Sequence, residues 1–286
     1  MKNNYIKSPF NYTGGKYKLL PQVMSLFPDD IKTFYDVFCG GLNVGINAKC
    51  KIVCANDKLI QVIDTFRMFR GSDGQHVINM IHRIIEQYGG INFKLDKDSY
   101  LKLREDYNNR VSMNRYDEAI LFYVLTCHSF SNQIRFNKKG GFNMPYGDRG
   151  FNEAMQQNLN SFLNKLHNTT ICLSNEDFDT FMSKKFDNMK RDDFVYFDPP
   201  YSGTTATYNE GGNWVRQNDI DLFLWADRLN TNDIRFAMSN ILNEQYKTAW
   251  ANKYNVHTLD YNYKNCNYQK KNKTGKKDTE VLITNY

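Results

Sequence analysis

Residues 193–201, with the sequence DFVYFDPPY, constrain the fold of this chain more than any other segment. The apolar and aromatic run at 194–197 predicts a buried β-strand. The strand must stop at the two consecutive prolines, because proline has no N–H to donate to a neighbouring strand. In open α/β sheets ligands bind beyond the carboxyl ends of the strands, so we expect the residues that follow this strand at a ligand-binding edge.

The four residues at that edge, Asp198-Pro199-Pro200-Tyr201, carry groups that suit one kind of ligand. The carboxylate of Asp198 and the backbone carbonyl of Pro199 both accept hydrogen bonds, which an exocyclic amino group can donate. The ring of Tyr201 offers a flat face for stacking. These groups predict a site for a planar heterocycle that bears an amino group. The alternative is a plain strand followed by a Pro-Pro turn.

The composition is that of a globular protein. The chain has 286 residues, 41% of them hydrophobic, which suffices for one large core or for a core with a smaller inserted domain. It has no apolar run of about 18 residues, and residues 1–16 lack the apolar stretch of a secretory signal, so we expect no membrane contact and a cytoplasmic location. The six cysteines are scattered without a CxxC pair, which predicts free thiols and no metal site.

The order of the expected elements indicates an α/β fold with a helical insertion. Residues 1–57 begin with a loop and end in a βαβ arrangement, in which a helix follows from Asn43. Residues 58–127 place apolar side chains at helical spacing. Residues 128–150 are rich in Gly and Asn, which predicts an extended loop or hairpin. Beyond residue 155 the α/β rhythm returns and closes with an antiparallel pair.

The individual elements of the two α/β parts follow from the same patterns. Helices are expected at 19–27, 159–166 and 219–229. Strands are expected at 32–38, 52–55, 169–173, 194–197, 235–238, 254–261 and 279–284.

Basic residues gather in two places, which says more than the net charge of +6. Arg135, Lys138, Lys139 and Arg149 bracket the Gly- and Asn-rich segment. Tyrosines and phenylalanines lie among the charges, a mixture that suits phosphate contact and base stacking. The second group of basic residues consists of Lys264, Lys270, Lys271, Lys273, Lys276 and Lys277. The alternative interpretation of this second group is a solvated loop that joins two strands.

Four motifs occur in an order that resembles one enzyme family. Residues 9–16 (PFNYTGGK) come first, 36–41 (DVFCGG) follow, Asn56-Asp57 ends the next strand, and 198–201 (DPPY) comes late. This combination resembles the Dam family of DNA adenine-N6 methyltransferases over nearly the full length, in the motif order of the α class. Residues 101–107 and 130–135 resemble the phage T4 branch of that family most closely.

The resemblance implies a class I methyltransferase fold that binds S-adenosyl-L-methionine and carries an inserted helical target-recognition domain. Residues 1–57 and 156–286 would form the catalytic domain, and 58–155 the insertion, with the DNA-contacting segment at 128–150. The implied activity is methylation of N6 of a flipped-out adenine in double-stranded DNA, within GATC. Rival readings are an amino-methyltransferase for cytosine N4, RNA or a protein amide, and a catalytically silent DNA-binding relative. A restriction endonuclease encoded elsewhere is the expected counterpart.

Cofactor contacts are expected near the glycine turn and the carboxylate that follows the second strand. Gly40 allows close backbone approach to a ligand, and Asp57 is placed like the acidic residue that binds ribose hydroxyls in Rossmann-type folds. Lys16, after the Gly14-Gly15 turn, is suited to pairing with a carboxylate. The cofactor residues implied by the resemblance are Tyr12, Lys16, Asp36, Phe38, Gly40, Asp57, Asp177, Phe178 and Asp198.

Catalysis is expected at residues 198–201, and DNA reading in the Gly- and Asn-rich segment. Asp198 and the Pro199 carbonyl would orient the N6 amino group, Pro200 would complete the rigid corner, and Tyr201 would stack on the flipped base. At position 133 this chain has glutamine, whereas the phage relatives have methionine. Arginine can bind guanine through two hydrogen bonds, as we expect of Arg135 and Arg149. The full set of implied DNA contacts is Phe130, Ser131, Gln133, Arg135, Pro145 and Arg149, with Phe130 intercalating.

Overall fold

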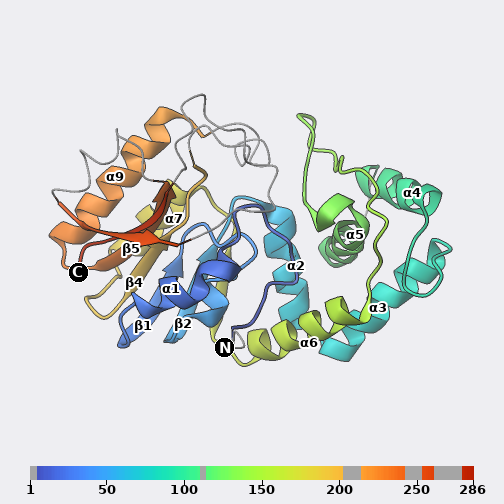
Figure 1. Ribbon diagram of the computed structural model, residues 1–286, viewed down its shortest axis with the longest axis horizontal. Helices are drawn as coiled ribbons and strands as arrows, with labels where there is room; N and C mark the ends of the chain where they lie inside the picture. Colours follow the sequence, from blue (N-terminus) through green and yellow to red (C-terminus); the bar gives the residue numbers. More distant parts are fainter. Residues whose placement is uncertain (1–4, 110–113, 202–213, 242–252, 261–278) are drawn as a thin grey trace.

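A seven-stranded sheet forms the centre of the larger part of the molecule in the computed structural model (Figure 1). The structure describes residues 5–109, 114–201, 214–241, 253–260 and 279–286. The strand order is β3-β2-β1-β4-β5-β7-β6. The strands are β1 (Ile31–Asp36), β2 (Cys50–Asn56), β3 (Ile171–Ser174), β4 (Phe194–Phe197), β5 (Arg235–Ile241), β6 (Asn255–Leu259) and β7 (Glu280–Thr284).

The sheet is mixed, with a parallel half and an antiparallel closure. The pairs that join β3, β2, β1, β4 and β5 are all parallel. β7 runs antiparallel to both β5 and β6, which confirms the expected closing pair. This arrangement is the mixed α/β sheet of a class I methyltransferase fold, as the sequence predicted.

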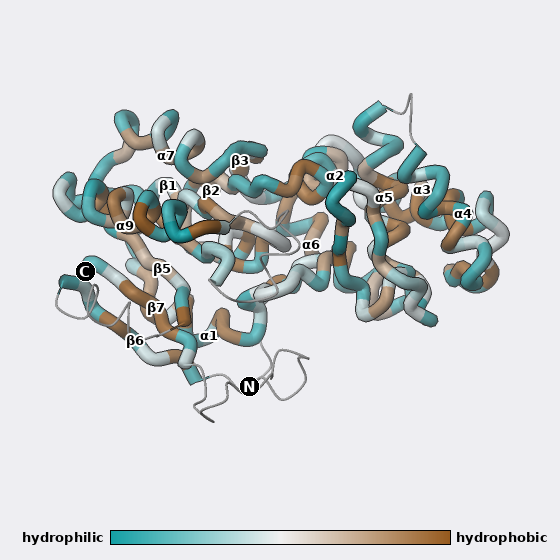
Figure 2. The backbone as a smooth tube through the Cα atoms, turned by 90° about the horizontal axis from the view of Figure 1, so that it is seen from above, coloured by the Kyte–Doolittle hydropathy of each residue, from teal (hydrophilic) through white to brown (hydrophobic). Residues whose placement is uncertain are grey.

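Helices cover both faces of the sheet because alternate strand residues point to opposite sides. On one face, Val195 and Phe236 pack with apolar residues of α7 (Phe178–Phe186) and α9 (Arg216–Thr231). On the other face, Phe34 and Phe194 pack with Leu20 and Val23 of α1 (Leu20–Ser25). Figure 2 shows the hydrophobic residues running along the strands and along α5 of the helical part.

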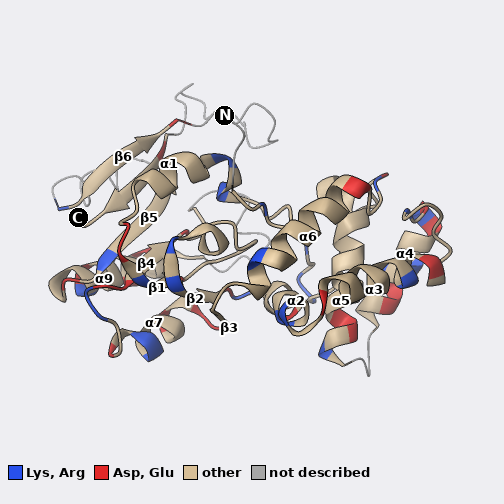
Figure 3. Cartoon of the chain, turned by 90° about the horizontal axis from the view of Figure 1, so that it is seen from below, with Lys and Arg blue, Asp and Glu red and all other residues tan. Residues whose placement is uncertain are grey.

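The helical part consists mainly of α2 (Ile60–Gly71), α3 (Gly74–Gln87), α4 (Lys97–Asn108), α5 (Arg115–His128) and α6 (Glu153–His167). Its core is continuous with the edge of the sheet, since Val53 and Ala55 of β2 belong to the same cluster of buried residues as α5. Asp73, Asp96, Asn114 and Asn152 cap the starts of α3 to α6 with their side chains. Figure 3 shows basic and acidic residues interspersed along these helices.

The prediction of a helix from Asn43 is wrong. A short 3-10 turn, Gly45–Asn47, stands there, and β2 begins three residues later. The side chain of Asn47 donates hydrogen bonds to the carbonyls of Ile6 and Asn43, both at 2.8 Å, and that of Asn43 accepts from Ser8 N. These side chains tie the turn to the N-terminal segment, and an asparagine that bonds to nearby backbone disfavours a regular helix.

Helix α7 was missed, although its signals are in the sequence. Asp177 caps the helix by accepting a hydrogen bond from Asp179 N, and Phe178, Phe181 and Met182 follow at helical spacing and are buried. The six lysines expected near DNA at 264–277 lie outside the described residues.

Strand direction brings chemically active residues to one edge of the sheet. β1 ends at Asp36, β2 ends just before Asp57, and β4 ends just before Asp198. Because β7 runs in the opposite direction, its first residue, Glu280, lies at the same edge. Four carboxyl groups from distant parts of the sequence therefore meet beyond the ends of neighbouring strands.

Phe10 fastens the N-terminal segment to the helical part. It is 2% exposed, and its ring centroid lies 5.5–5.9 Å from those of Phe66, Phe122 and Tyr123.

We expect Phe10→Ala to lower the free energy of unfolding by about 3–5 kcal/mol in chemical denaturation, since removal of the ring leaves a cavity. The matched control is Phe130→Ala, because Phe130 is 54% exposed and its loss should stay within about 0.5 kcal/mol. Equal losses in the two variants would contradict this role of Phe10.

Candidate active site

Two adjoining hollows lie at the carboxyl edge of the sheet, with empty volumes of about 490 and 610 Å³. We call the first the aromatic hollow, because Phe38, Phe178 and Trp214 line it. We call the second the glycine hollow, because Gly14, Gly15, Gly40 and Gly41 line it. Phe38 and Asp57 line both, so the two hollows are continuous.

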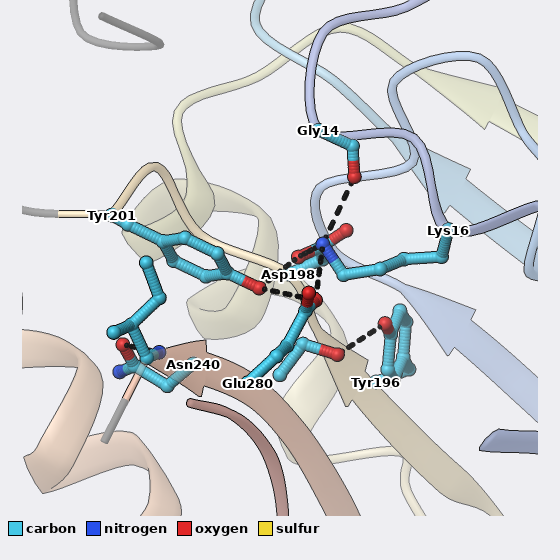
Figure 4. A network of polar contacts seen from close by, with 9 residues as sticks. Gly14, Lys16, Tyr196, Asp198, Tyr201, Asn240 and Glu280 are labelled. Carbon is cyan, nitrogen blue, oxygen red and sulfur yellow. Dashed lines mark hydrogen bonds and ion pairs between the residues drawn. The ribbon is translucent and has the colours of Figure 1, made fainter. Parts of the chain in front are cut away.

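A buried ammonium joins three segments at the glycine hollow (Figure 4). Lys16 lies in a 3-10 turn (Lys16–Leu19), and its Nζ is 2.8 Å from Asp198 Oδ1 and 3.3 Å from Glu280 Oε1. The same Nζ donates to the Gly14 carbonyl at 2.9 Å. The hydroxyl of Tyr201 donates to Glu280 Oε1 at 3.2 Å, and the Tyr201 ring lies 5.0 Å from Lys16 Nζ. Lys16 therefore pairs with carboxylates of the protein itself.

Burial and charge set the protonation of this pair. Burial alone would lower the pKa of Lys16, but Asp198 and Glu280 outweigh it and hold the pKa above its usual range. Burial raises the pKa of Asp198 to about 6, and the negative Glu280 adds to the rise while Lys16 opposes it. At neutral pH the site therefore holds an ammonium and an ionised Asp198.

Asp36 is a second buried carboxyl in the glycine hollow. Its Oδ2 accepts a hydrogen bond from Gly45 N at 3.0 Å, and its Oδ1 is buried without a partner among the described residues. Burial raises the pKa of Asp36 to about 8, and the neighbouring Asp198 and Asp57 add to the rise. Such an unpaired oxygen is costly unless a ligand or a proton satisfies it.

Asp57 joins the glycine turn to the end of β2. Its Oδ2 accepts from Gly40 N and its Oδ1 from Leu59 N, both at 2.8 Å. Gly40 has a φ of 46°, and the ring of Tyr12 would lie 2.9 Å from a Cβ there, so a larger residue would not fit. The close approach at Gly40 is thus to the protein's own Tyr12. Burial raises the pKa of Asp57.

Three rings from different segments pack against one another in the lining of the aromatic hollow. The ring centroids of Phe38, Phe178 and Trp214 lie 5.5–5.7 Å apart in pairs. Asp177, which begins α7, and Asn218 of α9 supply polar groups at its rim. The sequence analysis singled out Phe38, Asp177 and Phe178 but missed Trp214, whose only signal was an aromatic residue before a helical pattern.

Glu280 was missed as well. Its signal was a single carboxylate at the start of an otherwise apolar strand, EVLIT. Glu280 is 3% exposed, and a charged residue is seldom so deeply buried unless it is paired. Only the antiparallel direction of β7 places it beside Lys16, which the sequence pattern did not show.

The segment expected to read DNA forms an irregular hairpin at 129–146. Bridges join Ser129 to Tyr146 and Phe136 to Phe142. Ile134, Phe142 and Met144 are buried in the helical core, whereas Arg135 and residues 137–140 are exposed. The expected DNA contacts divide accordingly, with Ser131 half-buried and the others exposed: Phe130, Gln133, Arg135, Pro145 and Arg149.

Two residues at the base of the hairpin have an unusual conformation. Ser131 and Asn132 have φ values of 55° and 54°, which non-glycine residues rarely adopt. The side chain of Asn11 donates to the Ser131 carbonyl at 2.7 Å. Because Tyr12 follows Asn11 and lines the glycine hollow, one short segment contacts both the hairpin and the hollow.

Three further observations concern the described part of the chain. Where side chains are described, no group of three or more His, Cys, Asp or Glu residues is arranged to hold a metal ion. None of the helices in the described ranges combines the length and the apolar character that crossing a membrane requires. The described cysteines, Cys39 among them, are free.

Comparison with known proteins gives one family match and several relatives. The sequence model of the D12 class of N6 adenine-specific DNA methyltransferases matches residues 12–265. The chain is 39% identical to the modification methylase StsI of Streptococcus sanguinis and 37% identical to the type II methyltransferase M.FokI of Planomicrobium okeanokoites. Each alignment covers 99% of this chain but only 43% of the relative, so the chain spans less than half the length of these proteins.

A third relative matches over nearly its whole length. The type II methyltransferase M1.LlaDCHI of Lactococcus lactis subsp. cremoris is 27% identical, with 100% of this chain and 98% of the relative aligned. The DNA adenine methylase of Vibrio cholerae is 25% identical over 69% of this chain.

The raised pKa of Asp36 predicts a pH dependence of stability. An unfolded aspartate titrates near pH 4, whereas folded Asp36 titrates at about 8. Between these values the folded state holds a proton that the unfolded state lacks, so the free energy of unfolding falls as pH rises. Asp36→Asn keeps an acceptor for Gly45 N but cannot titrate. We expect its free energy of unfolding to fall less between pH 5 and 8 than that of the wild type.

Chemical denaturation at a series of pH values measures this difference. Asp29→Asn is the matched control, because the Asp29 side chain is 90% exposed and its change should leave the wild-type curve in place. Parallel curves for Asp36→Asn and the wild type would contradict the assignment of the titration to Asp36.

Proposed function

Because this chain belongs to the D12 class of N6 adenine-specific DNA methyltransferases, we propose that it methylates N6 of adenine in double-stranded DNA, with S-adenosyl-L-methionine as the methyl donor. The observation that carries the proposal is the position of Asp198-Pro199-Pro200-Tyr201. This corner follows β4 directly and lines the glycine hollow. It therefore offers a carboxylate, carbonyls and an aromatic ring to a base that enters from outside.

The two hollows fit the parts of S-adenosyl-L-methionine. The aromatic surface formed by Phe38, Phe178 and Trp214 suits stacking of an adenine ring, and Asp177 beside it suits the adenine's amino group. Asp57, which borders both hollows, accepts hydrogen bonds from two backbone N–H groups and the Tyr12 side chain, and its carboxylate has a further lone pair for a ribose hydroxyl. The unpaired Oδ1 of Asp36 in the glycine hollow suits the ammonium of the methionine part. When bound, the cofactor supplies a methyl group activated by a positive sulfur.

The residues of the corner act by orientation. Asp198, ionised at neutral pH, accepts a hydrogen bond from the N6 amino group, and the Pro199 carbonyl accepts the second. These bonds direct the nitrogen lone pair out of the plane of the base and toward the hollow, and such orientation lowers the barrier without a covalent intermediate. The Tyr201 ring stacks on the base. The base must leave the duplex, because its amino group is out of reach inside the helix.

The exposed hairpin is the proposed reader of the DNA sequence. Arg135 donates from Nε and Nη2 to the side chain and backbone of Asn143, at 2.8 and 2.7 Å. These bonds occupy one side of the guanidinium and leave its end, Nη1 and Nη2, to meet a guanine O6 and N7. Arg149 is exposed on the same segment. Phe130, exposed at the base of the hairpin, is the proposed intercalating ring, and Ser131 beside it is a proposed base contact.

The target and the biological setting complete the proposal. The Dam resemblance implies GATC, and GATC is the sequence to test first. Relatives of this chain carry the names of modification methylases and type II methyltransferases, so we propose a restriction endonuclease as its counterpart and host DNA in the cytoplasm as its substrate. The likeness to the phage T4 branch is an expectation from the motifs alone.

One experiment tests the activity and the target together. Plasmid DNA is incubated with the protein and S-adenosyl-L-methionine, its nucleosides are identified by mass spectrometry, and the modified positions are located by single-molecule sequencing. We expect N6-methyladenine in one sequence. N4-methylcytosine, or methylation of RNA or protein instead, would replace the proposed substrate, and binding of DNA without methylation would indicate a silent relative. N6-methyladenine in a sequence other than GATC would reject GATC as the target and leave the proposed activity in place.

Asp198→Ala should lower the turnover number at least about tenfold, because the amino group loses its main orienting contact. Cofactor binding, measured by calorimetry, should persist, since the aromatic hollow and Asp57 are unchanged. Asp192→Ala is the control, as that half-exposed carboxylate precedes the other end of β4. Turnover above about a tenth of the wild-type value would remove Asp198 from the reaction.

Arg149→Ala should reduce discrimination between the target and singly substituted duplexes by about 1–3 kcal/mol at one base pair. A base contact specifies, whereas a phosphate contact only positions the protein. Lys138→Ala, which removes an exposed cation from the hairpin, is expected to weaken binding of all duplexes alike. Competition binding at fixed salt decides between these outcomes. An unchanged preference ratio in Arg149→Ala would place Arg149 on the phosphate backbone and leave Arg135 as the reader.

A further inference from the structure

Three oxygens from three segments surround the ammonium of Lys16. Gly14 O, Asp198 Oδ1 and Glu280 Oε1 lie 2.9, 2.8 and 3.3 Å from Nζ (Figure 4). Lys16 donates a hydrogen bond to Gly14 O and forms ion pairs with both carboxylates. The ion pair with Asp198 is made through Oδ1, not through the second oxygen, Oδ2. Among the described residues no group donates a hydrogen bond to Oδ2.

Glu280 supplies one of the two ion pairs of Lys16. Its side chain is 1% exposed, and the reversed direction of β7 aims it at Lys16 from the side opposite Gly14 (Figure 4). The hydroxyl of Tyr201 also donates to Glu280 Oε1, at 3.2 Å, and lies farther from Asp198 Oδ1, at 3.5 Å. Glu280 thus draws two donors, the ammonium and the phenol, that would otherwise both turn to Asp198.

We propose that Glu280 is a positioning residue for the methylation: by holding Lys16 and Tyr201, it keeps one oxygen of Asp198 open for the amino group of the target base. This inference rests on the proposed function. Without Glu280, the ammonium is free to swing between both oxygens of Asp198. A buried lysine that bonds both oxygens would compete directly with the incoming amino group, which is a weaker partner for a carboxylate than an ammonium is.

Glu280 also sets the charge of the site. Two carboxylates, Asp198 and Glu280, share one ammonium, so the group is left with a negative charge in a buried place. In the methylation the amino nitrogen would form a bond to the methyl carbon as that carbon's bond to sulfur breaks, and it would be positive until it loses one of its protons to water. A negative group near that nitrogen stabilises the developing charge, and burial strengthens the effect.

Glu280→Gln separates these roles from a merely structural one. The variant keeps the shape and an acceptor but removes the charge. We expect the turnover number at pH 8 to fall about tenfold or more, as for loss of an orienting contact, with the Michaelis constants for DNA and cofactor changed far less. Glu86→Gln, on the exposed face of α3, is the matched control and should behave as the wild type.

The pH dependence supplies an independent readout. The titratable groups around Asp198 are Lys16, Asp36, Tyr196, Tyr201 and Glu280. The negative Glu280 raises the pKa of Asp198, which is about 6. Removing that charge should lower it, so the acid limb of the turnover profile should move to lower pH in Glu280→Gln.

Carbon-13 NMR of labelled aspartates follows the same titration in the free protein, with the Asp198 signal assigned from Asp198→Asn. We expect the Asp198 midpoint in Glu280→Gln to move to lower pH. Because this readout needs neither DNA nor cofactor, it tests Glu280 even if the wild type fails to methylate DNA. An unmoved Asp198 titration together with unchanged turnover would overturn the inference.

Glu280→Asp is a second test in case Glu280→Gln does not fold. Thermal unfolding shows whether each variant is folded. The shorter side chain keeps the charge but cannot span the same distance to Lys16. We expect reduced turnover with an acid limb close to that of the wild type. Wild-type turnover in Glu280→Asp would show that the contact with Lys16 is not required, and would also overturn the inference.

Discussion

The buried ammonium of Lys16 is the interaction on which the site depends. It joins the N-terminal turn, the end of β4 and the start of β7, three segments that are far apart in the sequence. Buried carboxylates are costly unless a cation pairs with them, and Asp198 and Glu280 share this one. Removing Lys16 would leave two like charges at the edge of the sheet. The close packing of a reactive corner against the sheet is therefore possible only because a lysine reaches it from outside the strands.

The same edge gathers more negative charge than the ammonium offsets, and this has a consequence for ligands. Asp36 and Asp57 lie beside the pair, and burial raises the pKa of both. A site of this kind favours a positively charged ligand, because the ligand satisfies oxygens that are otherwise protonated or unpaired. S-adenosyl-L-methionine carries positive charge at its sulfur and its ammonium, so the electrostatics of the glycine hollow agree with the cofactor that the family uses.

A short N-terminal segment connects the three working parts of the molecule. Phe10 packs in the helical core, the Asn11 side chain bonds the hairpin at Ser131, and Tyr12 lies against Gly40 in the glycine hollow. The hairpin that we propose to read DNA and the hollow that we propose to hold the cofactor are thus joined through a few side chains, and a shift of this segment would be felt at both.

The sequence alone determined the local features: the buried strand before the Pro-Pro corner, the helical insertion, the closing strand pair, and the carboxylates that end β1, β2 and β4. These follow from patterns within a few residues, such as apolar runs, glycine turns and prolines that cannot pair. It misjudged the segment after Asn43, because hydrogen bonds to residues 6 and 8 decide that turn. It could not show Glu280 beside Lys16 or Asn143 behind Arg135. Those contacts depend on strand direction and hairpin register, which only the packed tertiary structure decides.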